Sequence, residues 1–230
     1  MAKRQARFTP QEVTGDQRLL DHSPELWRDG FGDVARGLLA SAVRCFAANG
    51  FHATTTRDIC SAVGLSPAAL YVHFPSKELV LYAIARTGHE SALAEVRAAA
   101  AEPAADAAAR VRAVMARFTA WHARHHVAAR VCQYELTGLT PQHYDEIREL
   151  RHRTTEVFRD VVRRGVADGS FPATDVDRVV RSMLSLGIDL VRWYRLDGAD
   201  SPEQIGAFYA DLALRMLTAG APSEGRPGGG

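Results

Sequence analysis

Apolar residues recur along this chain at the spacing of helices. Between Asp33 and Asn49-Gly50 they lie three or four positions apart, and asparagine followed by glycine is a common way for a helix to end. No run of alternating β-branched residues is long enough to propose a strand. The pattern therefore predicts an all-α protein.

The next two expected helices are short and lie on either side of a tight turn. One begins after Thr55 and ends at Gly64, and the other begins at Pro67 and is terminated by Pro75. Proline's missing N–H costs nothing at the first helical position, which supports a helix start at Pro67. Two helices joined by such a turn have the layout of a helix-turn-helix.

Longer helices are expected in the rest of the chain. They are predicted over residues 77 to about 101, about 104–126, about 127–137, 141 to about 167, 176 to about 195, and 202 to about 218. Their long apolar stripes predict a helical bundle.

Both ends of the chain lack this periodicity. Residues 1–30 carry scattered proline and glycine and predict a flexible basic arm, and residues 221–230 predict a disordered tail. The chain is thus divided into an arm (1–30), a helix-turn-helix domain (31–80), a helical bundle (81–220) and a tail (221–230).

Composition narrows the class of protein. With 47% hydrophobic residues and a net charge of +1, the 230-residue chain is expected to fold, and any basic surface must be local. No stretch approaches the roughly 18 consecutive apolar residues of a membrane span, so we expect a cytoplasmic protein. Cys45, Cys60 and Cys132 form no CxxC motif and are expected to be reduced core residues.

Polar residues gather outside the helix-turn-helix. They are Thr55, Thr56 and Arg57 at the start of its first helix, Ser66 at the start of the second, and Tyr71, His73 and Lys77 afterwards. Helix N-termini with hydroxyls and free N–H groups bind phosphate. The polar set therefore favours a surface that contacts nucleic acid.

The same region carries a specific series of motifs. They are Gly50-Phe51, Thr54-Thr55-Thr56, Asp58-Ile59, Val63-Gly64-Leu65-Ser66, Leu70-Tyr71-Val72-His73-Phe74 and Ser76-Lys77-Glu78. Across roughly residues 33 to 80 this series closely resembles the TetR family of bacterial transcriptional repressors. The resemblance implies a homodimer that binds a pseudo-palindromic operator and has a carboxyl-terminal bundle for effector binding and dimerisation. No cofactor is expected.

The resemblance also implies roles for individual residues. The helix from Pro67 to Phe74 enters the major groove, and Tyr71, His73 and Lys77 hold phosphates. Thr55 and Thr56 anchor the preceding helix, while Arg57 is placed to reach a base edge.

One feature departs from a polar recognition helix, because its early positions are Ala68 and Ala69. We hypothesise that base discrimination relies on Ser66, on Arg57 and on contacts between the alanine methyl groups and thymine. Basic residues of the arm, namely Lys3, Arg4 and Arg7, would add shape readout in the minor groove, the alternative being a solvated tail.

Segments of the second half are similar to a TetR subgroup that includes regulators of fatty-acid and steroid catabolism. The segments are Leu190 to Arg195, Asp197-Gly198, Ser201-Pro202-Glu203, Glu135-Leu136 and Arg148 to Arg151. Some of these regulators respond to acyl-CoA thioesters, which need an apolar tube for the acyl group and arginines for the phosphates.

Candidate residues exist for both parts of such a ligand. The apolar candidates are Met115, Phe118, Trp121, Tyr134, Met183 and Leu186, and the phosphate or adenine candidates are Arg148, Arg151, Arg192, Trp193 and Arg195. Two alternatives remain open: another hydrophobic effector, or no small ligand, since apolar stripes usually form core and arginines at helical spacing usually face solvent.

The last two helices are candidates for a dimer interface, because family members resemble a four-helix bundle made by two helices from each subunit. The alternative is that their apolar stripes face only the internal core. In the mechanism we expect, an effector shifts the helix from Lys77 to Ala101 and so changes the separation of the two DNA-reading heads.

Other signals are weaker. Gly30 to Ala35 matches a dinucleotide-binding pattern but follows no strand. His122, His125 and His126 could hold a metal, although polar surface histidines are the preferred interpretation. A helical interaction module and a metal-responsive regulator remain alternative functions. No catalytic motif is present, so an enzyme is the weakest class.

Overall fold

The computed structural model describes residues 9–172 and 174–218, and every regular element in these ranges is a helix. The α-helices are α1 (Pro10–Gly15), α2 (Asp33–Asn49), α3 (Thr56–Ser61), α4 (Pro67–His73), α5 (Lys77–Ala101), α6 (Ala107–Arg124), α7 (His126–Tyr134), α8 (Pro141–Ala167), α9 (Val176–Asp189) and α10 (Pro202–Thr218). Short 3₁₀ helices are η1 (Gln17–Leu19), η2 (Ser23–Trp27), η3 (Leu136–Gly138) and η4 (Leu190–Arg192). The all-α prediction is confirmed.

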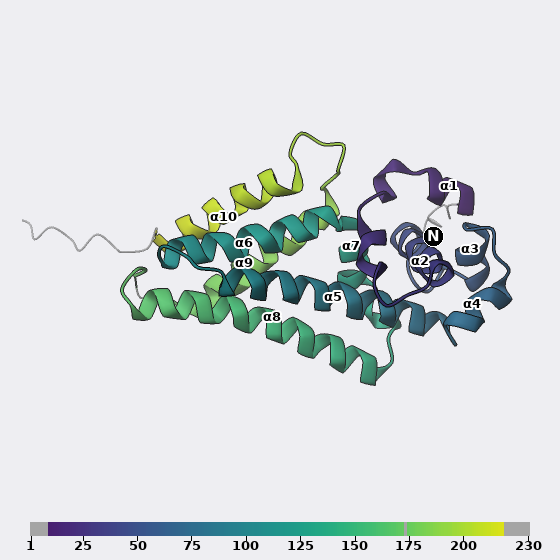
Figure 1. The fold of residues 1–230 in the computed structure, drawn as a ribbon, viewed down its shortest axis with the longest axis horizontal. Helices are drawn as coiled ribbons and strands as arrows, with labels where there is room; N and C mark the ends of the chain where they lie inside the picture. The colour runs from purple at the N-terminus through teal and green to yellow at the C-terminus, as the bar shows by residue number, and fades with distance from the viewer. Residues whose placement is uncertain (1–8, 173, 219–230) are drawn as a thin grey trace, which may run out of the picture.

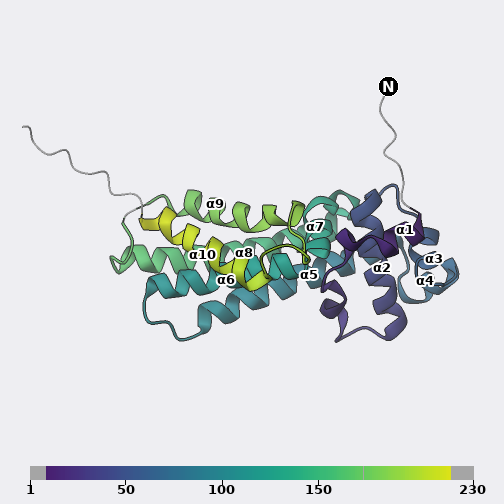
Figure 2. The same ribbon diagram turned by 90° about the horizontal axis from the view of Figure 1, so that it is seen from above.

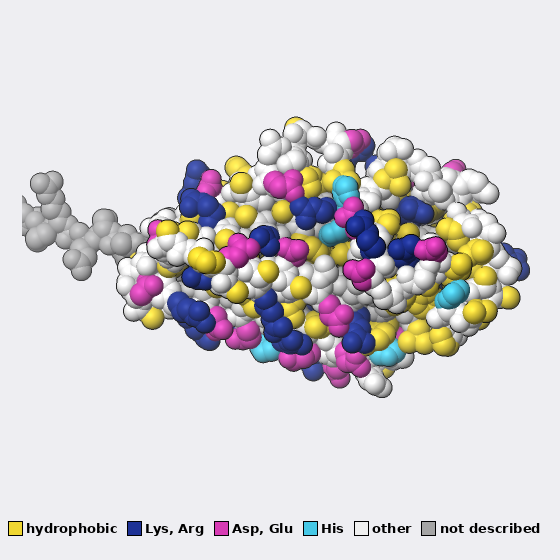
Figure 3. Space-filling model, viewed as in Figure 1, with side chains coloured by type: hydrophobic (Ala, Val, Ile, Leu, Met, Phe, Trp, Pro, Cys, Tyr) yellow, Lys and Arg dark blue, Asp and Glu magenta, His cyan; other side chains and the backbone are white. Residues whose placement is uncertain are grey.

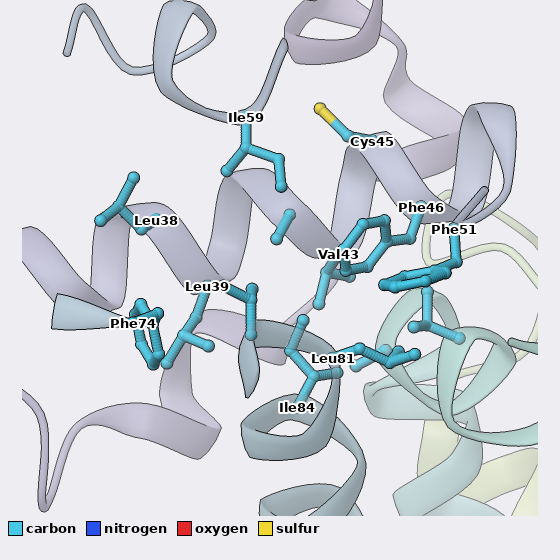
Figure 4. Packing of buried hydrophobic residues seen from close by; sticks show 14 of the residues in the cluster. Leu38, Leu39, Val43, Cys45, Phe46, Phe51, Ile59, Phe74, Leu81 and Ile84 are labelled. Carbon is cyan, nitrogen blue, oxygen red and sulfur yellow. The ribbon is translucent and has the colours of Figure 1, made fainter. Parts of the chain in front are cut away.

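Helices α2, α3 and α4 lie at one end of the molecule, and α5 runs from them into the bundle at the other end (Figure 1). Leu38, Leu39 and Phe46 of α2 are fully buried and pack with Ile59 of α3 and Ile84 of α5 (Figure 4). Burying one side chain of this size contributes about 1.5–3 kcal/mol. This shared core fixes the helix-turn-helix to the start of α5.

In the bundle, α6 packs along α10 and also contacts α5, α8 and α9 (Figures 1 and 2). The approach of α10 to α6 depends on Gly206, because a Cβ at this position would lie 2.6 Å from the carbonyl oxygen of Ala116. Gly187 of α9 plays a similar part, since its Cβ would lie 2.8 Å from the ring of Phe118. Small residues thus bring α9 and α10 close to α6.

Helix α7 lies between the bundle and the helix-turn-helix. Val127 and Val131 belong to the core that contains α2, whereas Ala129 packs in a different cluster with Trp121 of α6. The Arg130 guanidinium donates a hydrogen bond to the Ala47 carbonyl near the end of α2. One helix therefore contacts both halves of the protein.

The segment before α2 is folded, and the prediction of a flexible arm is wrong for its described part. α1, η1 and η2 lie in this segment and bury Val13, Leu19 and Trp27. These elements are three to six residues long, too short for apolar periodicity to reveal. Lys3, Arg4 and Arg7, like the tail at 221–230, lie outside the described residues.

The predicted bounds hold for three long helices that begin after a serine or threonine cap. α5, α8 and α10 match the prediction at both ends. α9, which was expected to reach Arg195, ends at Asp189 because the chain tightens into η4. The predicted domain boundary after residue 80 falls inside the continuous helix α5.

All three cysteines are buried, as predicted. Across residues 9–172 and 174–218, no helix combines the length and the apolar character needed to cross a bilayer.

Candidate nucleic-acid interface and ligand cavity

The turn between α3 and α4 is set by local chemistry. The Thr55 hydroxyl accepts the Asp58 N–H, and the Asp58 carboxylate accepts the Thr55 N–H at 2.8 Å, which forms a complete capping box at the start of α3. Gly64 then adopts φ +69°, a left-handed conformation that favours glycine. Ser66 precedes Pro67 at the start of α4, and its hydroxyl makes no capping hydrogen bond.

One face of α4 is buried and the other is open. Leu70 is fully buried, whereas Ala68, Tyr71 and His73 are exposed. Val72 is 80% exposed and was missed by the sequence analysis, although its position one turn after Ala68 places both on one helical face. The open face of α4 therefore offers methyl groups together with a phenol and an imidazole.

The polar residues of α3 differ in their availability. Arg57 is exposed and Thr56 is half-buried. Thr55 is exposed, but its hydroxyl is engaged in the capping box. Of the three, Arg57 has the longest reach into solvent.

Lys77 departs from the phosphate-binding role that the resemblance implies. Its ammonium donates to the carbonyl oxygens of Phe51 and Thr54, each at 2.7 Å, and lies 4.2 Å from the centre of the Phe51 ring. The Phe51 N–H in turn donates to the Glu135 carboxylate at 2.7 Å. Lys77 thus fixes the loop before α3 instead of presenting its charge outward.

Charged side chains of both signs alternate over the bundle in the face drawn in Figure 3. This distribution agrees with the net charge of +1. Attraction to a polyanion must therefore come from local contacts rather than from the field of the whole protein.

A cavity of about 360 Å³ lies between α5, α6, α7, α8 and α9. Its wall combines aromatic, aliphatic and polar side chains: His89, Ala92, Phe118, Trp121, His122, Ala129, Cys132, Gln133, Arg151, Thr154, Thr155, Arg159, Asp177, Arg181, Leu184, Ser185 and Ile188. A cavity of this size is within the range that holds small organic ligands.

Two buried histidines in this wall are neutral. Burial lowers the pKa of His89 to about 3, with a further contribution from the positive charge of Arg151, and burial lowers the pKa of His122 to about 4. His122 Nδ1 lies 2.8 Å from the Phe118 carbonyl and His89 Nε2 lies 3.3 Å from the Cys132 carbonyl, so these nitrogens carry the protons. Each ring keeps its second nitrogen as an acceptor.

Three arginines contribute to the cavity wall in different ways. Arg159 is paired with Glu156 and, at 2.7 Å, with Asp177. Arg151 is half-buried, and within the described part of the chain it has no ion pair. Arg181 is exposed at the same wall. Arg151 is therefore a cation that lines the cavity without a carboxylate of its own.

The structure brings together only some of the predicted ligand-binding residues. Phe118, Trp121 and Arg151 line the cavity. Met115 and Met183 are fully buried in the adjoining core.

The other predicted ligand-binding residues lie outside the cavity wall. Tyr134, Leu186 and Trp193 are exposed, and Arg148, Arg192 and Arg195 pair at the surface with Asp145, Asp189 and Asp197. The prediction treated the stretch to residue 195 as helix, but η4 ends the regular helix and turns the last of these residues outward.

The histidines at the end of α6 are buried, so the expectation of polar surface histidines is wrong. His122 and His125 pack against Trp121, and His126 packs against Tyr194. Among the residues that the structure describes, no group of three or more histidine, cysteine, aspartate or glutamate side chains could hold a metal.

Several cavity residues were missed by sequence reasoning. They are His89, Gln133, Thr154, Thr155, Arg159 and Arg181. They come from four helices, and no local pattern shows that these helices converge.

Comparisons with known proteins match both halves of the chain. Residues 38–84 match the family model for bacterial regulatory proteins of the tetR family, and residues 104–217 match a tetracyclin repressor-like carboxyl-terminal domain. The HTH-type transcriptional repressor KstR2 of Mycolicibacterium smegmatis is 33% identical over 187 residues, covering 79% of this chain and 89% of that protein.

Solved structures agree. A tetR-family regulatory protein from Rhodococcus RHA1 superposes with a TM-score of 0.75 and 39% identity over 82% of this chain and 98% of that one. KstR2 of Mycobacterium tuberculosis, described as a ketosteroid transcriptional regulator, has a TM-score of 0.75 and 28% identity over 82% of this chain and 96% of its own. The chain belongs to the TetR family of bacterial transcriptional regulators.

Proposed function

We propose that this protein is a repressor that binds operator DNA as a homodimer through α3 and α4 and is released by a small amphipathic effector. The observation that carries the proposal is the open face of α4, presented by a capped and rigid turn. A relative of similar length is named a transcriptional repressor, which supports the same assignment here.

Base recognition is assigned to Arg57, Ser66 and the methyl groups of α4. Arg57 can donate two hydrogen bonds to the edge of a guanine, and Ala68 and Val72 can contact the thymine methyl group. Tyr71 and His73, both exposed, are suited to phosphate contacts. Lys77 supports this surface indirectly by holding the loop before α3.

Replacing Arg57 by alanine should weaken operator binding about tenfold and relax discrimination at one base pair of each half-site, because a bidentate base contact is worth about 1–3 kcal/mol. Binding would be measured by fluorescence anisotropy with a duplex that the wild-type protein selects from random sequence. Arg163→Ala, at an exposed arginine of α8, is the matched control and should bind normally. An Arg57→Ala protein with unchanged discrimination contradicts this role.

Dimerisation is assigned to α9 and α10, which lie next to each other in the bundle (Figure 2). Each exposes a large apolar side chain, Leu186 on α9 and Phe208 on α10, the latter 58% exposed. Covering such side chains is a common source of interface stability. The anisotropy titration should accordingly saturate at two protein chains per operator duplex, one chain for each half-site.

The effector is assigned to the cavity enclosed by α5, α6, α7, α8 and α9. The half-buried guanidinium of Arg151 has no carboxylate partner in the described part of the chain, which favours a ligand with an anionic or strongly accepting group. Phe118 and Trp121 favour an apolar body. Acyl-CoA thioesters combine both features. A volume of about 360 Å³ suits the acyl portion, which leaves the nucleotide part near exposed Arg181.

Acyl-CoA thioesters should raise the thermal stability of the protein, whereas the matching free acids should do so less. A ligand at about 100 times its dissociation constant adds roughly 2.7 kcal/mol, which a melting experiment resolves. Arg151→Met should weaken the binding of the thioester at least about thirtyfold, because it removes a charge-assisted hydrogen bond.

The control for that experiment is Arg148→Met, which removes a surface arginine that pairs with Asp145 on the same helix. It should leave the stabilisation unchanged. If Arg151→Met retained the full shift, the anionic group would not be bound in this cavity. Equal stabilisation by the free acids would identify a carboxylate ligand in place of a thioester.

A further inference from the structure

Residues 16–27, hereafter the strap, cross from the helix-turn-helix to the bundle and back. The strap contains η1 and η2 and connects α1 to the loop before α2. The family model for the DNA-binding region begins at residue 38, so the strap lies outside it. The contacts of the strap therefore have to be explained from the residues of this chain.

At the bundle, the strap caps the start of α7. One Asp21 carboxylate oxygen accepts the Val127 N–H at 2.8 Å, and the Ser23 hydroxyl oxygen lies 3.3 Å from the Ala128 N–H. The His22 N–H donates to the carbonyl of Arg124, the last residue of α6, at 3.1 Å. The strap thus satisfies backbone groups on both sides of the α6–α7 junction, which would otherwise be unpaired helix ends.

At the helix-turn-helix, the strap is anchored by apolar contacts. Trp27 is fully buried, Leu19 is also buried, and both belong to the core that contains α2 and Ile59 of α3. α1, which precedes the strap, buries Val13 in the same core and contacts both α2 and α3. The amino-terminal end of the strap is therefore fixed to the helices that face DNA.

The same α6–α7 junction lies between two residues of the cavity wall. His122 lies one turn before the junction and Ala129 one turn after it, and both line the cavity. Leu26 of the strap packs against the cluster that contains Trp121 and Ala129. A ligand that displaces this wall also displaces the groups that the strap holds.

We propose that the strap is a further mechanical connection between the ligand cavity and the DNA-facing helices, in addition to α5 and to the packing of α7 against α2. Asp21 is its positioning residue: it joins the α6–α7 junction, which adjoins the cavity wall, to a segment that packs against α2 and follows α1, which contacts α3. The proposal goes beyond the proposed function, and the coupling can be measured without DNA or effector. Its failure is therefore distinguishable from failure of the proposed function.

The test is amide hydrogen exchange, followed by mass spectrometry, on the full-length protein. Asp21→Ala should accelerate exchange about fivefold in the first turn of α7, as expected for a lost helix cap. Coupling requires a second effect, an acceleration of at least about twofold in α1 and α3, which Asp21 does not contact. Exchange in α10 should remain at the wild-type rate.

Asp106→Ala is the matched control, because Asp106 caps the opposite end of α6 through the Ala109 N–H at 2.7 Å. It should accelerate exchange in the first turn of α6 and leave α1 and α3 unchanged. Acceleration confined to α7 in Asp21→Ala would overturn the proposal. So would equal acceleration in α3 and α10, which would indicate general destabilisation.

A second variant tests the connection from the other end. Val13→Ala loosens the packing of α1 on the helix-turn-helix, and coupling between two sites is reciprocal. Exchange at Val127 and Ala128, which share one core with Val13 but lie in a different element, should therefore rise. Wild-type exchange at these two amides, with faster exchange in α1, would contradict the strap as a connection.

Discussion

Trp27→Ala is expected to lower the free energy of unfolding by about 3–5 kcal/mol, the usual cost of deleting a large aromatic side chain from a core. Trp27 is fully buried and packs among residues of the helix-turn-helix core. Its indole N–H has no hydrogen-bond partner in the described structure, so the substitution breaks no hydrogen bond and the expected loss comes from packing. Urea denaturation followed by circular dichroism measures the change.

Trp193→Ala supplies the comparison, because Trp193 is 52% exposed. It should change the free energy of unfolding by no more than about 0.5 kcal/mol, as surface substitutions usually do. A loss below about 1 kcal/mol in Trp27→Ala would mean that the segment before α2 is not part of the folded core in solution.

The protein should lose several kcal/mol of stability when the pH falls from 7 to 5. His89, His122 and His125 have pKa values lowered by burial to about 3, 4 and 4, while each would titrate near 6.5 in the unfolded chain. Below pH 6.5 the unfolded state therefore binds protons that the folded state does not. Stability falls as the pH decreases through this window, until the folded-state pKa values are reached.

Each such histidine contributes about 2 kcal/mol between pH 7 and 5, since one pKa unit corresponds to about 1.4 kcal/mol. Urea denaturation at pH 7, 6 and 5 gives the free energies. His122→Gln, which cannot titrate, should reduce the difference in bound protons between the unfolded and folded states by one and so flatten the pH dependence. An equal slope in the variant and the wild-type protein would contradict the buried neutral assignment.

The helix-turn-helix could be predicted from sequence because its signals are local. The capping residue Thr55, the positive φ of Gly64 and the proline at the start of α4 each act within a few residues. The same holds for α8 and α10, whose starts carry a threonine or serine cap followed by proline. Such elements need no knowledge of the tertiary fold.

The predictions that were wrong concern features that depend on contacts between segments far apart in the sequence. Trp27 is buried where η2 packs against α2, and His122 packs beside Phe118, which Gly187 of α9 approaches closely. The cavity combines five helices, so periodicity could suggest Phe118 and Trp121 but could not show that Trp193 faces solvent. The role of Lys77 was missed for the same reason, because its partners lie more than twenty residues away.

The two-sided packing of α7 restricts how the ligand specificity of this protein can diverge. Cys132 and Gln133 face the cavity while Val131 lies in the core with α2, so a change of size in this helix also alters the DNA-binding half. The wall residues Thr154 and Thr155 belong to α8, which contributes none of the described residues of the core around α2 and lies outside the proposed dimer interface. New ligand preferences, whether evolved or engineered for a biosensor, should therefore accumulate on α8.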